Sequence, residues 1–589
     1  MAEKLRPLQR FFRLLQLDRK DIVYIYVYAV FAGLITLSLP LGVQAIIGLI
    51  AGGDMSASLI ILILIVTVAT ALSGILKVMQ LTVSETIQRR IFARSAFDFA
   101  YRVPRFKLES LTDEYAPELV NRFFDTLNLQ KGLPKILIDF STAALQIIFS
   151  LILISFYHPF FVFFGIALMV ILLLIIRYTG PGGLQTSLKE SKYKYKVVYW
   201  LEEVARAMDT FKLAGRTPLP MKKTDDLVVN YLKSRKAHFR ILLFQYGNIV
   251  AFKTIVTAGL LALGGYLVIN NQINIGQFVA AEIVVILVMN SVEKIILTME
   301  TIYDVLTALE KIGYVTDLPI EESEGIRFSE IDSGQGLHIQ TSNLSYTFND
   351  SKKPAIKDLS LDIQPGERLC IAGYNGSGKS TLLKILAGLY IEHEGTVSYN
   401  GFASGSLDME SLRGAIGDIC PEEDIFRGTI YDNISMGNED IDARQIVKAL
   451  RDVGLDPFIE RQQEGIQFQL LPGGSNVSRS VRTRLMVARA IVRKPTMLAV
   501  EGMFRGMETG DRLRFARLLA NRDNPWTLIV VSDDPIMASH CDRILIMRKG
   551  QIVEEGTFDD LMHSDYFNAV FRTADNMMLA KGVENLSAK

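Results

Sequence analysis

Residues 368–380 read Arg-Leu-Cys-Ile-Ala-Gly-Tyr-Asn-Gly-Ser-Gly-Lys-Ser, which is a short apolar run, a glycine-rich turn and the start of a helical pattern. The turn from Gly373 to Ser380 fits the pattern G-x-x-x-x-G-K-[ST] between a strand and a helix, the context that this pattern requires. Glycines allow successive backbone N–H groups to converge on phosphate oxygens, and the N-terminus of the helix adds a favourable dipole. The segment therefore predicts a phosphate-binding loop (P-loop) within an α/β domain.

The chemistry of this loop indicates a nucleoside triphosphate as its ligand. The Lys379 ammonium group is placed to reach the terminal phosphates, and the Ser380 hydroxyl can ligate Mg²⁺. We expect a nucleoside triphosphate and Mg²⁺ as cofactors, with the nucleotide held by Gly373, Asn375, Gly376, Ser377, Gly378, Lys379, Ser380 and Thr381. An intact loop implies binding and does not by itself imply hydrolysis.

The composition of the chain changes at residue 319. After Pro319, a polar linker with three glutamates precedes a region that alternates short apolar strands with turns and helices. We predict a membrane domain over residues 1–319, a linker over 320–335, a nucleotide-binding domain over 336–575 and a C-terminal tail over 576–589.

Length and charge exclude some classes of protein. A chain of 589 residues is too long for a single core. Lys and Arg number 63 and so do Asp and Glu, and the formal net charge of +0 argues against a broad nucleic-acid-binding surface. Hydrophobic residues make up 49% of the chain although 21% are charged, which indicates one apolar half and one ordinary half. The three cysteines, all in the second half, form no disulfide framework and suit a cytosolic domain.

Long runs almost free of charge fill the first half of the chain. The first, residues 22–53, contains no charged residue and exceeds the roughly 20 residues that cross a bilayer. The other runs are residues 55–76, 140–157, 160–176, 254–271 and 278–296. We therefore predict an α-helical domain with six spans in a lipid bilayer. Between spans two and three, and between spans four and five, helices should continue beyond the lipid.

Basic residues predict the orientation of the spans. The links at residues 53–54, 158–159 and 270–276 contain no Lys or Arg, whereas the segments over 89–135 and 177–240 are rich in both. Both termini and the nucleotide-binding domain should therefore lie in the cytoplasm. Pro40 lies within the first span and predicts a kink there.

Charged residues near the membrane leave two interpretations open. Asp139, Lys253, Glu282 and Glu293 mark either an ion or substrate path or, towards cytoplasmic ends, snorkelling side chains and extramembrane helix; the second account fits Glu282 least. Residues 5–17 interleave apolar and Arg side chains, which suits either a helix in the cytoplasmic interface or a plain surface helix.

Several stretches outside the P-loop carry a family resemblance. Together with the six spans, they make the chain resemble one half of an ATP-binding-cassette (ABC) exporter over nearly its whole length. The resemblance is greatest to the protein- and peptide-exporting branch associated with type I secretion. The stretches are Leu39-Pro40-Leu41, Asn274-Ile-Gly-Gln277-Phe, Leu361-Asp-Ile-Gln-Pro-Gly-Glu367, Phe426-Arg-Gly-Thr-Ile-Tyr-Asp-Asn433, Arg484-Leu-Met-Val-Ala-Arg489-Ala490 and Asp542-Arg-Ile-Leu-Ile-Met-Arg-Lys-Gly550.

The resemblance implies a dimer in the cytoplasmic (inner) membrane. In that family two cassettes close head to tail on ATP, and short coupling helices pass the closure to the spans. By position these fall near residues 108–118 and 215–223, where the alternative is an ordinary helical hairpin turn. We expect a dimer with a second half-transporter, a different chain rather than a copy of this one, and further partners in a secretion complex. No nucleic acid is expected as a partner.

The motifs after the P-loop depart from the family pattern. The signature, usually Leu-Ser-Gly-Gly-Gln, reads Val477-Ser478-Arg479-Ser480-Val481, so only Ser478 remains in place and side chains replace two glycines. The strand that should end in Asp-Glu ends in Glu501-Gly502. Glu501 can still reach a metal, but Gly502 offers no carboxylate for general-base work.

Three other positions bear on the same site. The glutamine that senses the γ-phosphate falls at Pro421 or Glu422, and the later histidine is Asp533, whose charge repels a triphosphate unless it is paired or bridged by a metal. Phe348 falls where the family stacks an aromatic ring on adenine; the alternative is a core aromatic on a strand. The losses indicate either a decayed cassette that holds nucleotide, or an unusual ATPase in which Glu501 and Glu422 replace the lost groups.

Two functions follow from these patterns. The first is an ATP-driven pump that exports a peptide or protein, with hydrolysis supplied mostly by its partner. The second is a non-hydrolysing regulatory or scaffold subunit of a secretion complex. The P-loop supports nucleotide binding under both, whereas Gly502 and Asp533 favour the second for this chain alone.

Overall fold

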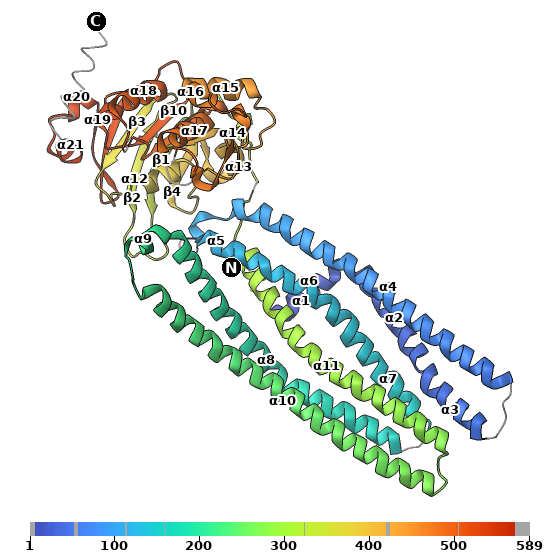
Figure 1. The fold of residues 1–589 in the computed structure, drawn as a ribbon. Helices are drawn as coiled ribbons and strands as arrows, with labels where there is room; N and C mark the ends of the chain where they lie inside the picture. The colour runs from blue at the N-terminus through green and yellow to red at the C-terminus, as the bar shows by residue number, and fades with distance from the viewer. Residues whose placement is uncertain are drawn as a thin grey trace. The chain divides into compact units, whose positions relative to one another are not determined.

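The computed structural model describes residues 6–51, 57–111, 115–157, 160–322, 324–419, 425–504 and 506–571. The chain divides into two compact units, one comprising Met1–Arg105 and Glu114–Pro319 and the other Phe106–Asp113 and Ile320–Lys589. The first is a set of long helices and the second is built on β-sheets (Figure 1). Several predictions lie outside the described residues: Pro421 and Glu422, the links at 53–54 and 158–159, and the tail over 576–589.

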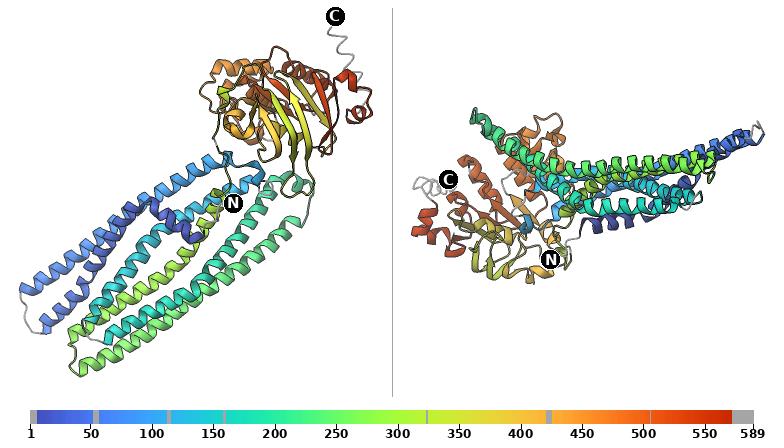
Figure 2. Two further views of the ribbon diagram at one scale, coloured as in Figure 1. Left: turned by 180° about the vertical axis from the view of Figure 1, so that it is seen from behind. Right: turned by 90° about the horizontal axis from the view of Figure 1, so that it is seen from below.

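Long helices make up the first unit. They are α1 (Pro7–Leu17), α2 (Arg19–Thr36), α3 (Ser38–Ala51), α4 (Ala57–Arg102), α5 (Ala116–Asn121), α6 (Asp125–Lys135), α7 (Ser141–Ser155), α8 (Phe160–Arg206), α9 (Met208–Leu213), α10 (Leu219–Ile269) and α11 (Ile275–Thr316), with short turns at Val103–Arg105, Arg122–Phe124 and Ile136–Phe140. α4, α8 and α10 run for 46, 47 and 51 residues, as expected of helices that continue beyond the lipid. α2 packs along α4, and α8 along α10 (Figure 2).

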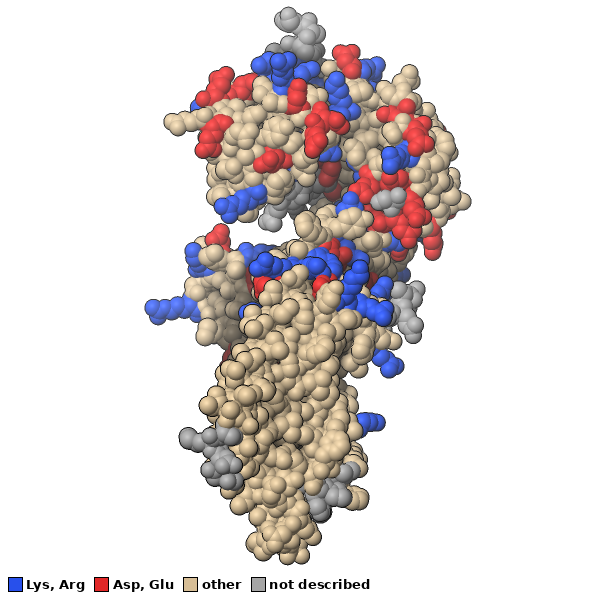
Figure 3. All heavy atoms as spheres, turned by 90° about the vertical axis from the view of Figure 1, so that its right-hand side faces the viewer, with Lys and Arg blue, Asp and Glu red and all other residues tan. Residues whose placement is uncertain are grey.

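The surface of the helical unit is suited to lipid. Among the described residues, five segments are long and apolar enough to cross a membrane: Arg19–Ala51, Ala57–Arg105, Pro117–Ser155, Leu219–Ile269 and Ile275–Thr316. The remaining predicted span, residues 160–176, forms the first part of α8. Figure 3 shows a long stretch of this unit with few charged side chains and a group of Lys and Arg near one end of it. This pattern is typical of a membrane domain with basic residues on its cytoplasmic side.

The first span is interrupted close to Pro40. α2 ends at Thr36 and α3 begins at Ser38, with Leu37 between them. Pro40 has no N–H to donate to the Thr36 carbonyl and its ring crowds that carbonyl, so the ladder of helical hydrogen bonds breaks here. The kink predicted from the sequence is confirmed.

Most of the charges considered for an ion path are paired within this unit. Lys253 Nζ lies 3.3 Å from Glu293 Oε2, and Lys294 Nζ lies 2.8 Å from Asp139 Oδ1. Opposite charges in contact favour structural ion pairs at these positions. Glu282 is half-buried and takes no part in these two pairs.

A six-stranded sheet of order β12-β11-β3-β10-β9-β6 forms the centre of the second unit. β12 is antiparallel to β11 and the other neighbours are parallel, as expected where strands alternate with helices. The four-stranded sheet β2-β1-β4-β5 and the pair β7-β8 complete the sheets. The strands are β1 (Ile339–Tyr346), β2 (Ile356–Ile363), β3 (Arg368–Gly373), β4 (Glu394–Tyr399), β5 (Phe402–Ala403), β6 (Ile416–Ile419), β7 (Gly428–Thr429), β8 (Gln469–Leu470), β9 (Met497–Glu501), β10 (Thr527–Val531), β11 (Arg543–Arg548) and β12 (Gln551–Gly556).

Helices cover both faces of the six-stranded sheet. The helices of the second unit are α12 (Lys379–Leu386), α13 (Met409–Gly414), α14 (Ile430–Ser435), α15 (Ala443–Asp452), α16 (Asp456–Ile459), α17 (Arg479–Val492), α18 (Thr509–Leu519), α19 (Pro535–Ala538), α20 (Phe558–Leu561) and α21 (Asp565–Val570). Consecutive side chains of a strand point to opposite faces. On β3, Leu369 and Ile371 join the buried cluster that includes α12, whereas Cys370 and Ala372 join the one that includes α17. Burial on both faces explains why this strand reads as a continuous apolar run.

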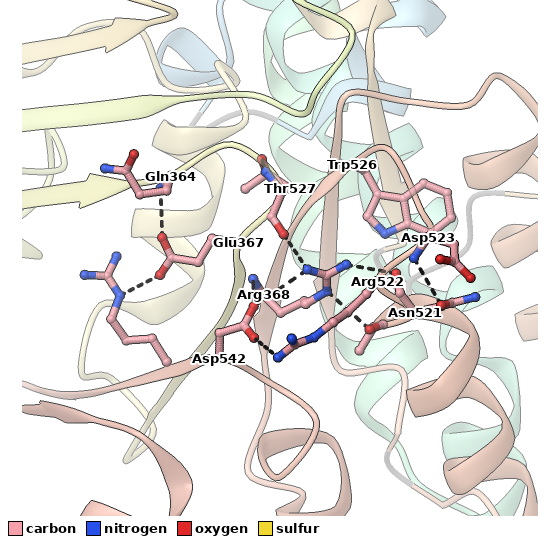
Figure 4. Close-up of polar contacts among 12 residues, drawn as sticks. Gln364, Glu367, Arg368, Asn521, Arg522, Asp523, Trp526, Thr527 and Asp542 are labelled. Atoms are coloured by element: carbon pink, nitrogen blue, oxygen red, sulfur yellow. Dashed lines mark hydrogen bonds and ion pairs between the residues drawn. The ribbon is translucent and has the colours of Figure 1, made fainter.

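A buried arginine fixes the beginning of β3. The Arg368 side chain donates hydrogen bonds to the carbonyl oxygens of Gly366 at 2.7 Å, Ala520 at 3.2 Å and Asn521 at 2.9 Å (Figure 4). Its backbone N–H donates to Asp542 Oδ2 at 3.0 Å. Bonds from an ionised group are stronger than neutral ones, so the strand that carries the P-loop is held firmly at its base.

Candidate functional site

The predicted P-loop joins the carboxyl end of β3 to the N-terminus of α12. Gly373, Gly376 and Gly378 have φ values of 147°, 77° and 102°, which glycine adopts without strain. A Cβ atom on Gly373 would lie 2.3 Å from the Met547 carbonyl oxygen, and one on Gly378 would lie 2.5 Å from the Ala355 carbonyl oxygen. Two of the motif glycines are therefore required by close backbone approach as well as by conformation.

Lys379 folds over the mouth of the loop. Its Nζ atom donates hydrogen bonds to the carbonyl oxygens of Gly373 at 2.6 Å and Tyr374 at 2.8 Å. An ammonium group beside a helix N-terminus is an arrangement that attracts phosphate. The other predicted loop residues lie around it: Asn375, Gly376 and Ser380 are exposed, Ser377 is buried, and Gly378 and Thr381 are half-buried.

The two predicted metal ligands are in contact. The Ser380 hydroxyl, in the first turn of α12, donates a hydrogen bond to Oε1 of Glu501 at the end of β9. Hydroxyl and carboxylate oxygens are donors that Mg²⁺ prefers, and the ion usually keeps waters and phosphate oxygens as its other ligands, so this pair fits it. Across the described part of the chain, no group of three or more His, Cys, Asp and Glu side chains offers a separate metal site.

The positions expected to promote hydrolysis lack suitable groups. Gly502 follows Glu501 with φ of 66° and offers no side chain. Asp533, beyond the end of β10, is exposed and brings a negative charge to the edge of the sheet where Glu501 lies. The adjacent Asp534 is used structurally, because it caps α19 and pairs with Arg512 at 2.8 Å. Glu501 thus suits a metal, and position 502 supplies no general base.

Ser478 caps the N-terminus of α17. Its hydroxyl accepts a hydrogen bond from the Val481 N–H at 3.3 Å. Arg479 and Ser480, at the positions of the two expected glycines, are the first helical residues and are exposed. Within the described residues, no hydrogen bond joins Ser478 to the P-loop of the same chain. The helix at the predicted signature thus has a serine cap, and the two positions where glycine was expected carry side chains.

Phe348 belongs to a cluster of three aromatic rings. It meets Tyr346 edge to face with centroids 5.0 Å apart and Tyr390 in the same way at 6.0 Å. Tyr346 and Tyr390 stack at 5.2 Å with 9° between their planes. Burial, with Glu109 nearby, raises the pKa of Tyr346 to about 12, so its hydroxyl stays protonated near neutral pH. Phe348 is half-buried against the core, so the core alternative holds in part and stacking on a base stays a prediction.

Sequence patterns did not single out Glu109 or Tyr390. Glu109 lies in the turn Leu108–Leu111, which belongs to the second unit, and its carboxylate accepts a hydrogen bond from Ile391 N. The one signal in the sequence is that residues 108–118 form the tip of a loop; of these, 112–114 lie outside the described residues. The other predicted tip, 215–223, spans the connection from α9 to the start of α10 in the first unit.

Two family descriptions match the two halves of the chain. That of the ABC transporter transmembrane region matches residues 22–292, and that of the ABC transporter domain matches residues 356–501. The chain belongs to the ABC transporter family. Membership makes it an integral membrane protein with an ATP-binding domain in the cytoplasm.

Curated relatives of this ABC transporter chain include two named for toxin translocation. It is 27% identical over 370 residues to the exotoxin translocation ATP-binding protein PaxB of Pasteurella aerogenes, and 27% identical over 371 residues to the alpha-hemolysin translocation ATP-binding protein HlyB of Escherichia coli O157:H7. Each match covers 62% of this chain and 51% of the relative, so the chain spans about half the length of these relatives. The ATP-dependent lipid A-core flippase of Francisella tularensis is 26% identical over 257 residues, 43% of this chain and 41% of that one.

A solved structure shares the fold. It is a bacterial Atm1-family ABC exporter with ATP bound, with a TM-score of 0.82 and 17% sequence identity, and the match covers 94% of this chain and 97% of that one. The predicted fold class, a helical membrane domain of the ABC exporter type joined to an α/β P-loop domain, is confirmed.

Proposed function

We propose that the chain is one half of an ABC exporter that binds ATP at residues 373–381 and exports a peptide or protein. It does so in a dimer with a different half-transporter, in the inner membrane, together with partners of a secretion complex. Hydrolysis at its own site is weak or absent. The observation that carries this proposal is an intact P-loop beside Gly502, a residue with no side chain at the position of the catalytic carboxylate.

Nucleotide binding is supported by the geometry of the loop. The glycine conformations shape a loop whose amides can converge on phosphates, and Lys379 lies at its mouth. Ser380 and Glu501 would hold Mg²⁺, which neutralises charge on the β- and γ-phosphates. Phe348 would stack on the base, and Ser478 would face the nucleotide held by the partner.

Weak hydrolysis is supported by the groups at the edge of the sheet. Loss of a catalytic base typically lowers a rate by about 10²–10⁴-fold. Asp533 would add repulsion against the triphosphate unless its charge is paired or bridged by a metal, since like charges at close range disfavour each other. A cassette of this kind depends on its partner for most of the hydrolysis that drives a transport cycle.

Export of a peptide or protein is supported by the relatives. PaxB and HlyB are named as translocation proteins for an exotoxin and a hemolysin, and both match over the same share of this chain. A second candidate is a non-hydrolysing regulatory or scaffold subunit, and the exposed acidic Asp533 favours it. The two differ in whether export stops when this chain can no longer bind ATP.

Equilibrium binding tests the proposal. ATP binding to the purified full chain, measured by calorimetry with Mg²⁺ present, should weaken about 10- to 100-fold in Lys379→Ala, because a hydrogen bond to a charged group is lost. Equal affinities in the two proteins would contradict nucleotide binding at the P-loop. Co-purification from native membranes should recover a second, different half-transporter; recovery of this chain alone would contradict the heterodimer.

A further inference from the structure

A buried carboxylate in the segment after α4 binds backbone amides far along the chain. Glu109 is 7% exposed, and its Oε1 atom accepts hydrogen bonds from Ile391 N at 2.6 Å and Glu392 N at 3.1 Å. Hydrogen bonds to an ionised carboxylate are shorter and stronger than those between neutral groups. Glu109 therefore fixes the backbone at residues 391–392.

Neighbouring contacts hold the same segment more weakly. Asn349 Nδ2 donates to the Glu109 carbonyl oxygen at 3.4 Å, and Lys107 Nζ lies 2.8 Å from Glu392 Oε1. The Glu392 side chain is 61% exposed, and ion pairs at such positions contribute little. Loss of the Glu109 carboxylate would leave two amides without their acceptor, which is costly in a buried place. Of these contacts, the hydrogen bonds to the Glu109 carboxylate therefore contribute most to holding residues 391–392 in place.

The residue before the two amides belongs to the aromatic cluster. Tyr390 stacks on Tyr346 and meets Phe348 edge to face. Lys384 of α12, the helix that begins at the P-loop, lies with Nζ 5.6 Å from the centre of the Tyr390 ring. The backbone that Glu109 holds thus sets the place of a ring that contacts both Phe348 and the P-loop helix.

We propose that Glu109 is a positioning residue for the aromatic surface, formed by Phe348 and Tyr390, that receives the base of the bound nucleotide. This inference rests on the proposed function, because the phosphates of the same nucleotide lie on the P-loop. Glu109 acts through the backbone at 391–392 and does not touch the ligand.

Two ligands separate the base from the phosphates. Mg-ATP and Mg-tripolyphosphate both engage the P-loop, and only ATP carries a base. Glu109→Gln keeps an acceptor oxygen but loses the charge that strengthens the bonds to residues 391–392. ATP binding by the purified full chain should therefore weaken roughly three- to tenfold while tripolyphosphate binding stays unchanged, because the aromatic contact shifts and the P-loop does not. Phe348→Leu should also weaken ATP binding and leave tripolyphosphate binding unchanged, because it removes an aromatic ring from the surface that receives the base. Lys107→Ala, a matched change in the same segment, should alter neither affinity.

The outcomes are distinct. Equal weakening of both ligands by Glu109→Gln would show that Glu109 supports only the fold, and unchanged ATP binding would show no link to the base; either result overturns the inference. If Glu109→Gln does not fold, Phe348→Leu tests whether the aromatic surface receives the base. Equal weakening of ATP and tripolyphosphate binding in this variant would overturn the inference. An unmodified chain that binds neither ligand would contradict the proposed function instead.

Discussion

At the scale of single residues, Asp542 forms ion pairs with two arginines that differ in burial. The Arg368 side chain is 10% exposed and also binds three carbonyl oxygens, whereas the Arg522 side chain is 84% exposed and lies 3.3 Å from Asp542 Oδ1. Unequal burial predicts unequal effects on stability, because a buried group that loses its partner cannot bind water instead.

Arg368→Met should therefore lower the free energy of unfolding of the second unit by about 2–4 kcal/mol. Arg522→Ala, the matched control, should change it little, since exposed ion pairs contribute little. Thermal unfolding followed by the fluorescence of Trp526 measures both. The sequence has two tryptophans, so a Trp200→Phe background leaves Trp526 as the reporter. Equal midpoints for the two variants would contradict this account of β3.

His393 should make the second unit sensitive to acid. Burial lowers the pKa of His393 below its ordinary 6.5, because the charged imidazolium is disfavoured there. Because the folded protein binds this proton less readily than the unfolded chain, the contribution of His393 to the stability of the fold is greatest above about pH 6.5. It is lost as the pH falls towards the pKa of His393 in the folded protein. The Trp526 unfolding midpoint should thus fall between about pH 7 and pH 5. His393→Gln should reduce the pH dependence of this midpoint. The same pH dependence in the variant would contradict a role for His393.

At the level of single residues, a prediction could be made where a motif is local. Gly373 to Ser380 are consecutive, so their pattern could be read directly, and Glu501 was placed by the strand before it. Glu109 could not be found in this way, because its partner Ile391 lies 282 positions further along the chain. Such a contact depends on how the whole unit folds.

At the scale of elements, α8 and α11 pack through a glycine. A Cβ atom on Gly183 of α8 would lie 2.3 Å from Cζ of Tyr303 on α11, whereas one on Gly180 would meet nothing within 4 Å. The Tyr303 hydroxyl also accepts a hydrogen bond from Gln245 at 2.9 Å, so the ring is not easily displaced. Close packing at this crossing requires glycine at position 183.

Gly183→Ala should therefore destabilise the helical unit by about 1–3 kcal/mol through overpacking. Gly180→Ala, one helical turn away, should be neutral or slightly stabilising, because alanine favours the helix and finds open space. Unfolding in detergent, followed by Trp200 of α8 in a Trp526→Phe background, measures the difference. A Gly183→Ala midpoint at or above that of Gly180→Ala would contradict the packing described.

Element type was readable from the sequence because long apolar runs, Pro40 and the P-loop each have a local physical cause. The π-helical turn at Ile136–Phe140 was not predicted, since no residue pattern in that segment marks it. The role of Phe348 was left between two alternatives, because its surroundings include Tyr390 from another part of the chain.

At the scale of the whole molecule, the proposed function makes this chain a subunit that binds a triphosphate and leaves its hydrolysis to a partner. Restoring the missing carboxylate at position 502 alone should not restore hydrolysis. Gly502→Glu would place a side chain at φ of 66°, which costs about 1–2 kcal/mol, and Asp533 and the altered signature would remain. Phosphate release by Gly502→Glu should stay close to that of the unmodified chain; recovery of rapid turnover would contradict the view that several losses act together.

The most direct measurement is steady-state phosphate release by the purified chain without any partner, in lipid nanodiscs, compared with Lys379→Ala. We predict equal or nearly equal rates at saturating Mg-ATP, although the unmodified chain binds the nucleotide and the variant binds it weakly. A much higher rate for the unmodified chain, abolished by Glu501→Gln, would contradict the claim that this cassette binds ATP but hydrolyses it weakly or not at all.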